Sequence, residues 1–150
     1  MTDPLSPSLV LVPVDGSEES LTAVEYAVTI ADEYDAAVHA LYVVSEDLAR
    51  AMNTGAVDDA SVAADTKAFM QAVTNLVDDA GVPLSTSMAH GFSTRQLSRH
   101  PGSVVLDTAE ELGADFVVVP RESVSGDPDE VLAKAAEYVL LYASQPVLSV

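Results

Sequence analysis

The chain has 150 residues, and its 24 acidic against 6 basic side chains give a formal charge of -18. This length fits one domain, and because 49% of the residues are apolar, the chain can bury enough surface to fold instead of remaining disordered. The negative charge opposes binding to nucleic acid and to anionic membranes, since both attract basic patches. We therefore expect a single domain over residues 1–150, with a flexible tail at residues 1–8.

Two further features of the composition suggest where the protein works. The chain has no cysteine, and its first apolar run, Leu9–Val14, is too short for a signal peptide core or a membrane span, so we expect a cytoplasmic protein. The 14 aspartates exceed the 10 glutamates, and Lys67 and Lys134 are the only lysines. This balance resembles that of halophilic proteins, in which strong salt screens the repulsion between carboxylates.

Apolar runs alternate with helical patterns along the first half of the chain. Leu9–Val14 is apolar at nearly every position, as in a strand buried on both faces of a parallel sheet, and Ser17 can cap a helix that reaches about Asp35. Ala37–Val44 is a second run of this kind. Apolar residues at helical spacing then predict a second helix, which ends before Gly81. The apolar face of this second helix is formed by Val62, Phe69, Val73, Leu76 and Val77.

The next part of the chain predicts two strands around a short helix. Leu84–Ala89 alternates more than the other strand segments, which is typical of a strand at the edge of a sheet. Ser103 can cap the helix that follows, and Gly113 can end it. The apolar run Phe116–Val119 then predicts another buried strand, which stops at Pro120.

The last part of the chain predicts a helix and a fifth strand, Val147–Val150. Asp127 and Pro128 are typical residues for the opening of a helix. Five strands that alternate with four helices predict a doubly wound, Rossmann-like α/β fold with a parallel sheet, in which ligands bind at the carboxyl ends of the strands. The apolar positions of the last helix are Val131, Leu132, Ala135, Val139 and Leu140.

Three segments of this pattern, in order and at matching separations, resemble the universal stress protein family. Leu9–Ser20 is similar to the family's first strand and turn, Ala109–Asp115 to its penultimate segment, and Gln145–Val150 to its last strand. The resemblance implies the strand order 3-2-1-4-5 and a stress-response module that binds or signals through a protein partner still to be identified. It also implies a homodimer formed through the fifth strand, which here consists of Val147, Leu148, Ser149 and Val150.

Nucleotide-binding members of that family carry a glycine motif after the fourth strand: Gly, two residues, Gly, nine residues, then Gly with Ser or Thr. Counting back from Pro146, these positions hold Pro120, Ser123, Ala133 and Lys134. The glycines let backbone amides approach phosphates, whereas proline has no N–H and a fixed φ. We therefore expect neither ATP bound in the usual way nor any other cofactor. Four carboxylates in this region would also repel a triphosphate: Glu122, Asp127, Asp129 and Glu130.

The adenosine half of the site matches the nucleotide-binding relatives better. These positions also have a structural explanation. Val14 and Val43 suit the core of a strand, and Asp15 suits a turn in which its carboxylate accepts hydrogen bonds from nearby backbone amides. The alternative is therefore a member that holds AMP or ATP and meets a phosphate with Arg121 or Lys134. In the competing interpretation, Lys134 pairs with Asp15 or a helical carboxylate. The positions that contact base and ribose in those relatives hold Pro13, Val14, Asp15 and Val43.

The remaining polar residues suggest no catalytic centre. The segment His90–His100 concentrates positive charge through Arg95 and Arg99, which could bind an anion or pair with the chain's own carboxylates. The three histidines have no metal-type spacing, and mid-strand His39 is expected to be a packed, hydrogen-bonded imidazole. Because Ser17 lacks the Gly-x-Ser-x-Gly context of a nucleophile, we expect no catalytic residue, no metal and no enzyme, although weak ATP hydrolysis stays open.

Overall fold

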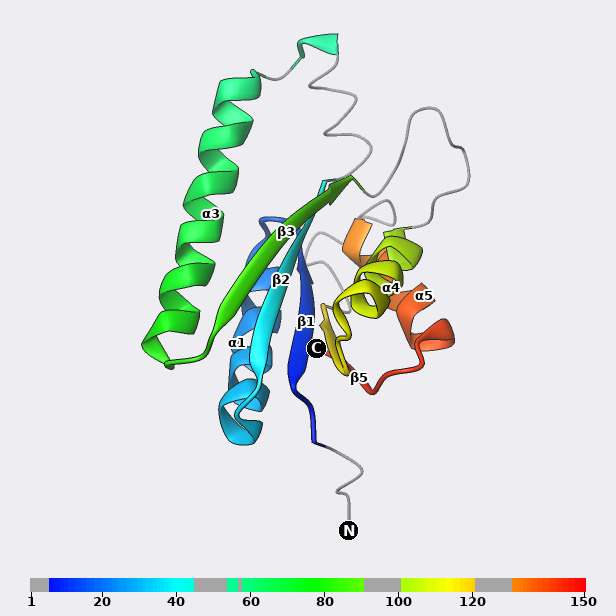
Figure 1. Cartoon of the computed structure of the whole chain (residues 1–150). Coiled ribbons are helices and arrows are strands. Elements are labelled where there is room, and N and C mark those ends of the chain that lie inside the picture. Colours follow the sequence, from blue (N-terminus) through cyan, green and yellow to red (C-terminus); the bar gives the residue numbers. More distant parts are fainter. Residues whose placement is uncertain (1–5, 45–53, 57, 91–100, 121–130) are drawn as a thin grey trace.

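The structure, a computed structural model, describes residues 6–44, 54–56, 58–90, 101–120 and 131–150 (Figure 1). In this part of the chain five parallel strands form one sheet in the order β3-β2-β1-β4-β5, which confirms the expected fold class and strand order. The strands are β1 (Leu9–Val14), β2 (Ala37–Val44), β3 (Leu84–His90), β4 (Phe116–Val119) and β5 (Val147–Ser149). The helices are α1 (Glu18–Tyr34), α3 (Asp59–Asp79), α4 (Pro101–Leu112) and α5 (Val131–Tyr142).

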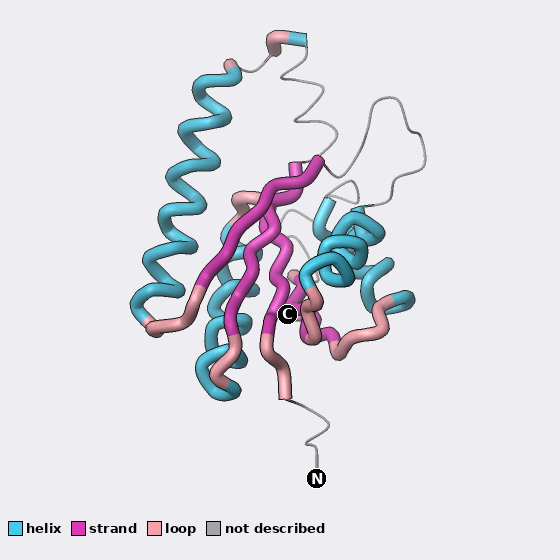
Figure 2. Tube along the Cα trace, viewed as in Figure 1, coloured by secondary structure: helices cyan, strands magenta, loops and turns pink. Residues whose placement is uncertain are grey.

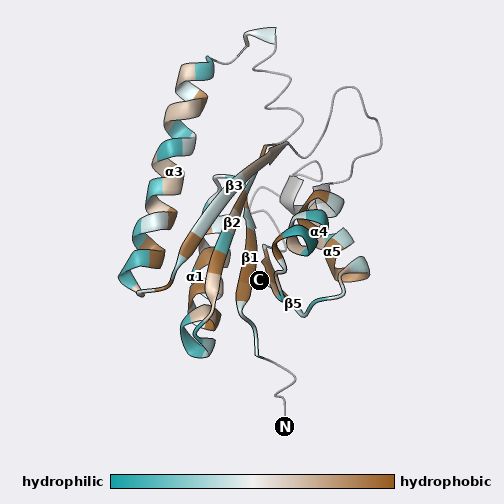
Figure 3. Ribbon diagram, in the orientation of Figure 1, coloured by the Kyte–Doolittle hydropathy of each residue, from teal (hydrophilic) through white to brown (hydrophobic). Residues whose placement is uncertain are grey.

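Helices cover both faces of the sheet, so that the strands lie between two helical layers (Figure 2). Side chains alternate along β1: Val10, Val12 and Val14 pack with α1 and α3, whereas Leu11 packs with α4 and α5. Apolar residues accordingly concentrate on the strands and on the inward sides of the helices (Figure 3). This double burial explains why the first two strands are continuous apolar runs.

The boundaries of α1 follow from local chemistry. The hydroxyl of Ser17 accepts a hydrogen bond from the backbone N–H of Ser20 at 3.2 Å, which confirms the predicted N-cap. The helix ends at Asp35, which adopts the left-handed conformation with φ of 53°. Both ends lie within one residue of the positions that the sequence predicts.

The predicted start of α4 and one predicted core position of α5 were wrong. Ser103 is not the N-cap of α4, because the helix already begins at Pro101, and proline suits the first position of a helix, where no N–H is needed. Leu140 was expected on the apolar side of α5, yet its side chain is 53% exposed. The predicted opening of that helix, Asp127 with Pro128, lies outside the described residues.

The beginning of β1 is fixed by the turn that precedes β4. The carboxylate of Asp115 accepts hydrogen bonds from the backbone N–H groups of Ser8 (2.9 Å) and Leu9 (3.0 Å), and the N–H of Asp115 donates to the carbonyl of Leu9 (3.1 Å). Pro7 is buried nearby in the sequence. The expected tail over residues 1–8 therefore includes two residues, Pro7 and Ser8, that packing and hydrogen bonds hold in place.

Candidate functional site

The carboxyl ends of β1 and β2 carry the four residues that the sequence assigns to an adenosine site. Pro13 is buried, Val14 is 0% exposed and Val43 is 1% exposed. Val14 belongs to the apolar cluster beneath α1 and α3, whereas Val43 belongs to the cluster beneath α4 and α5. The two valine side chains therefore lie on opposite faces of the sheet, and both are core residues, as the packing explanation predicts.

The fourth of these residues, Asp15, forms the turn between β1 and α1. Its Oδ1 accepts from the backbone N–H of Ser17 at 3.0 Å and from the Ser17 hydroxyl at 2.5 Å, while the hydroxyl of Tyr42 donates to the Asp15 carbonyl at 3.4 Å. Gly16 adopts φ of +91°, and a Cβ there would lie 3.1 Å from the Tyr42 hydroxyl. The turn role of Asp15 is thus confirmed, and both of its side-chain hydrogen bonds end on one carboxylate oxygen.

The fourth strand brings Pro120 to the same end of the sheet. β4 pairs directly with β1, with Leu11 opposite Val117, and continuation of this register by three residues places Pro120 level with Val14. Pro120 is buried. Parallel strands β2 and β4 flank β1 on either side, so the strand order reverses here, at the point where doubly wound sheets bind their ligands.

Most of the side chains that the sequence predicts near the carboxyl ends of β1 and β4 lie outside the described part of the structure. Ala133 and Lys134 belong to α5, but their side chains are outside the described part of the structure. The remaining candidates for the phosphate and anion sites also lie outside the described residues: Arg95, Arg99, Arg121 and Ser123. The described part of the candidate site therefore consists of the carboxyl ends of β1, β2 and β4 and of the turn at Asp15.

A second polar group is centred on His39 in β2. Its side chain is 4% exposed, its Nδ1 lies 2.7 Å from the hydroxyl of Ser85, and its Nε2 lies 2.7 Å from the hydroxyl of Ser87. The prediction of a packed, hydrogen-bonded imidazole is confirmed. The sequence analysis missed the two serines, although their spacing of two residues on β3 places both on one face of the sheet.

Burial lowers the pKa of His39 below its ordinary value of 6.5. The unfolded chain therefore binds a proton near pH 6.5 that the folded protein takes up only at lower pH. We expect the stability due to neutral His39 to be complete above pH 6.5 and to be lost as the pH falls below it, by up to about 1.4 kcal/mol per pH unit.

Urea unfolding of the wild type and of His39→Gln between neutral and mildly acidic pH tests this expectation. Because glutamine does not titrate, the variant shows how the other groups respond to pH. The wild type should lose more stability than the variant as the pH is lowered. Parallel curves for the two proteins would contradict a depressed pKa of His39.

Neither a metal cluster nor a membrane span emerges from the described residues. Within them, no three side chains of the His, Cys, Asp or Glu type come together in a way that could hold a metal ion. In the same part of the chain, none of the helices combines the length and the hydrophobicity that a bilayer span requires.

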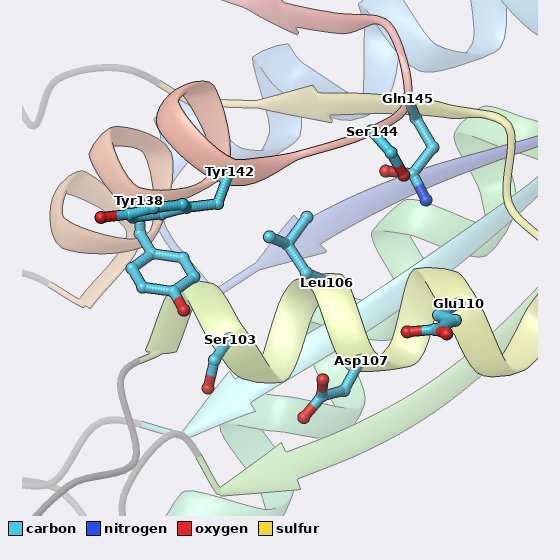
Figure 4. A pocket seen from close by; sticks show the side chains of 8 residues that line it. All are labelled: Ser103, Leu106, Asp107, Glu110, Tyr138, Tyr142, Ser144 and Gln145. Carbon is cyan, nitrogen blue, oxygen red and sulfur yellow. The ribbon is translucent and has the colours of Figure 1, made fainter.

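A groove between α4 and α5 is a feature that the sequence analysis missed entirely. Its volume is about 420 Å³, and its lining includes Tyr138 and Tyr142 of α5 and Asp107 and Glu110 of α4 (Figure 4). The only sequence signal was the spacing of these residues, three or four positions apart on each helix, which puts each pair on one face.

Comparisons with known proteins agree with this architecture. A family model described as the universal stress protein family matches residues 9–150. The universal stress protein MJ0531 of Methanocaldococcus jannaschii is 29% identical over 146 residues, which cover 94% of this chain and 80% of that protein.

Solved structures show the same fold at low sequence identity. The structure of the protein MJ0577 has a TM-score of 0.76 at 18% identity and covers 97% of this chain and 96% of its own. A universal stress protein in complex with cAMP has a TM-score of 0.68 at 21% identity, covering 97% and 98% of the two chains. The dAMP complex of a universal stress protein from Archaeoglobus fulgidus has a TM-score of 0.64 at 15% identity, with the same coverage. With the family match over residues 9–150, these findings lead to one conclusion: the chain belongs to the universal stress protein family.

Proposed function

We propose that this protein is a homodimeric binding or signalling module of the stress response that does not hold the phosphates of ATP in the manner usual for its family. The observation that carries this proposal is Pro120, buried directly after β4 and level with the end of β1. A phosphate site at this position uses backbone N–H groups, and proline has none.

The sequence that follows Pro120 supports the same proposal. None of the other three motif positions, Ser123, Ala133 and Lys134, holds the glycine or hydroxyl residue that the motif requires there. The region also contributes four carboxylates to a chain of charge -18, and this potential opposes the approach of a triphosphate. Loss of amide donors and repulsion act together, so the proposed loss of ATP affinity does not depend on a single residue.

Mass spectrometry of the intact protein and calorimetric titration with Mg-ATP, both on protein purified in strong KCl, test this proposal. We expect the wild type to carry no nucleotide and to give no saturable heat with ATP. A variant that restores the motif, with Pro120→Gly, Ser123→Gly, Ala133→Gly and Lys134→Ser, should gain ATP affinity, because the floor formed by β1 and β2 is unchanged. Stoichiometric ATP on the wild type would overturn the proposal.

A second candidate is a nucleotide-holding member that binds a monophosphate. Two structurally similar universal stress proteins are complexes with cAMP and dAMP, each of which has one phosphate and therefore makes little demand on a triphosphate loop. The turn at Asp15 supports this candidate, since Oδ2 of its carboxylate makes no hydrogen bond among the described residues. Copurification of AMP in place of ATP, with weaker binding in Asp15→Asn, would favour this second function.

The dimer is proposed through β5, which lies at an edge of the sheet. The backbone N–H of Val150 donates to the carbonyl of Val119 in β4. Because N–H groups alternate in direction along a strand, the N–H of Ser149 points to the open edge. Leu140 and Leu141, 53% and 74% exposed, add apolar surface near the end of α5. A second copy pairing along this edge would cover the outward N–H of Ser149.

We expect light scattering in strong salt to give twice the chain mass of 15.7 kDa. Ser149→Pro removes the outward N–H without affecting the bonds to β4, and should therefore shift the protein to the monomer. Ser149→Ala retains that N–H and should remain dimeric. A monomer mass for the wild type would refute pairing through β5.

A further inference from the structure

The groove between α4 and α5 has two chemically different ends. The rings of Tyr138 and Tyr142 lie at one end, with their centroids 4.7 Å apart, whereas Glu110 and Gln145 lie at the other (Figure 4). Leu106 lies between the two ends. The volume of about 420 Å³ is in the range of small-molecule sites. Its lining does not include Pro13, Asp15 or Pro120, so the groove is distinct from the site at the strand ends.

Negative charge and aromatic rings in this groove favour a cation. None of the described lining residues is basic, and the carboxylate of exposed Glu110 has no hydrogen-bond or ion-pair partner among the described residues. The faces of tyrosine rings attract ammonium groups through their quadrupole. Asp107 and Tyr138 already have interaction partners within the chain, so the argument depends on Glu110 and Tyr142.

The carboxylate of Glu110 indicates that the cation carries N–H groups. A carboxylate accepts strong, charge-assisted hydrogen bonds from N–H donors. A quaternary ammonium has no N–H and could not form such a bond, whereas a protonated amine could.

The length of the groove selects among amines. The ring of Tyr142 lies 4.7 Å from that of Tyr138, which contacts Gly102 at the start of α4. Glu110 is eight residues further along that helix, so the tyrosine end of the groove and Glu110 are separated by roughly 12 Å along the axis. An extended triamine covers such a span better than a short diamine. A hydrated divalent metal ion fits poorly, because tyrosine faces and Leu106 provide no oxygen ligands.

We propose that this groove binds a linear aliphatic polyamine. One ammonium group donates to Glu110, the methylene chain lies against Leu106, and a second ammonium group lies over the ring of Tyr142. The charge of -18 raises the concentration of such cations near the surface. Leu140, two residues from Tyr142, lies about 200° around the helix from it and therefore on a different side of α5 from the groove, whereas Leu141 lies about 100° from Tyr142.

Calorimetric titration of the full chain with spermidine tests the proposal, at the lowest KCl concentration that preserves the folded circular dichroism spectrum. We expect saturable binding of one spermidine per chain. Glu110→Gln should weaken this binding about tenfold, because a charged hydrogen bond becomes a neutral one. Tyr142→Leu, which retains an apolar side chain without the ring, should weaken it about fivefold.

The matched control is Glu111→Gln, which removes the same charge from the next residue of α4, outside the groove lining. Its affinity should stay within about twofold of the wild type, as is typical of an exposed charge. Equal losses in Glu110→Gln and Glu111→Gln, or heat that never saturates, would show that spermidine acts only as a counterion and would overturn the proposal. No nucleotide takes part in the titration, so its outcome is independent of the proposed function.

Discussion

Gly102→Ala is expected to lower the free energy of unfolding by about 3 kcal/mol, at the upper end of the usual cost of overpacking. A Cβ at this position would lie 2.3 Å from Cβ of Tyr138, 2.6 Å from its Cγ and 2.7 Å from its Cδ1. The first of these atoms is fixed to the backbone of α5, so rotation of the ring cannot relieve the clash. The two helices must move apart or bend.

The sign of this effect distinguishes it from an ordinary helix substitution. Alanine in place of glycine inside a helix normally stabilises a protein by about 0.5–1 kcal/mol, because glycine loses more backbone entropy on folding. Urea unfolding should show the opposite here, and the melting temperature should fall by roughly 6–12 °C for a chain of this size. Glu111→Ala, at an exposed position of α4, serves as the control and should change little. Unchanged or increased stability of Gly102→Ala would mean that the helices are not in close contact.

Transfer from strong KCl into dilute buffer is expected to lower the melting temperature by on the order of 10 °C, which corresponds to about 3 kcal/mol in a domain of this size. The reason is the charge of -18. Carboxylates crowd the exposed side of α1, where Glu25, Asp32 and Glu33 are within nine residues of one another and no Lys or Arg occurs in the helix. Salt shortens the range of their repulsion, and without it the compact state is penalised.

Thermal unfolding followed by circular dichroism at a series of KCl concentrations measures this effect. The variant Asp32→Asn with Glu33→Gln reduces the charge without touching the core and should reduce the slope of melting temperature against salt. Sucrose stabilises proteins by exclusion from their surface and does not screen charges, so it serves as the control. It should raise the melting temperatures of the wild type and of the double variant equally. A melting temperature that does not respond to KCl would contradict a role for charge repulsion.

The sequence by itself determined the positions of the strands and most of the predicted helix ends, because these positions depend on residues that are close together in the chain. Continuous apolar runs gave β1 and β2 with their observed bounds, since both are buried on two faces. Ser17 gave the start of α1 through its cap. The order of the strands came from the resemblance to a known family, which no local pattern contains. At the candidate site, the sequence left Asp15 open between a ligand-binding role and a turn role, and it favoured core packing over ligand contact for the valines.

Tertiary structure alone decided which side chains meet. Gly102 has no left-handed conformation to explain it, and its reason is the approach of Tyr138 from a different helix. The serine partners of His39 and the groove between α4 and α5 likewise combine residues from separate elements. Periodicity tells which face of one element is apolar, but the packing of two elements fixes the distance and register between them. For this reason the fold could be predicted from the chain, whereas the second candidate binding site could not.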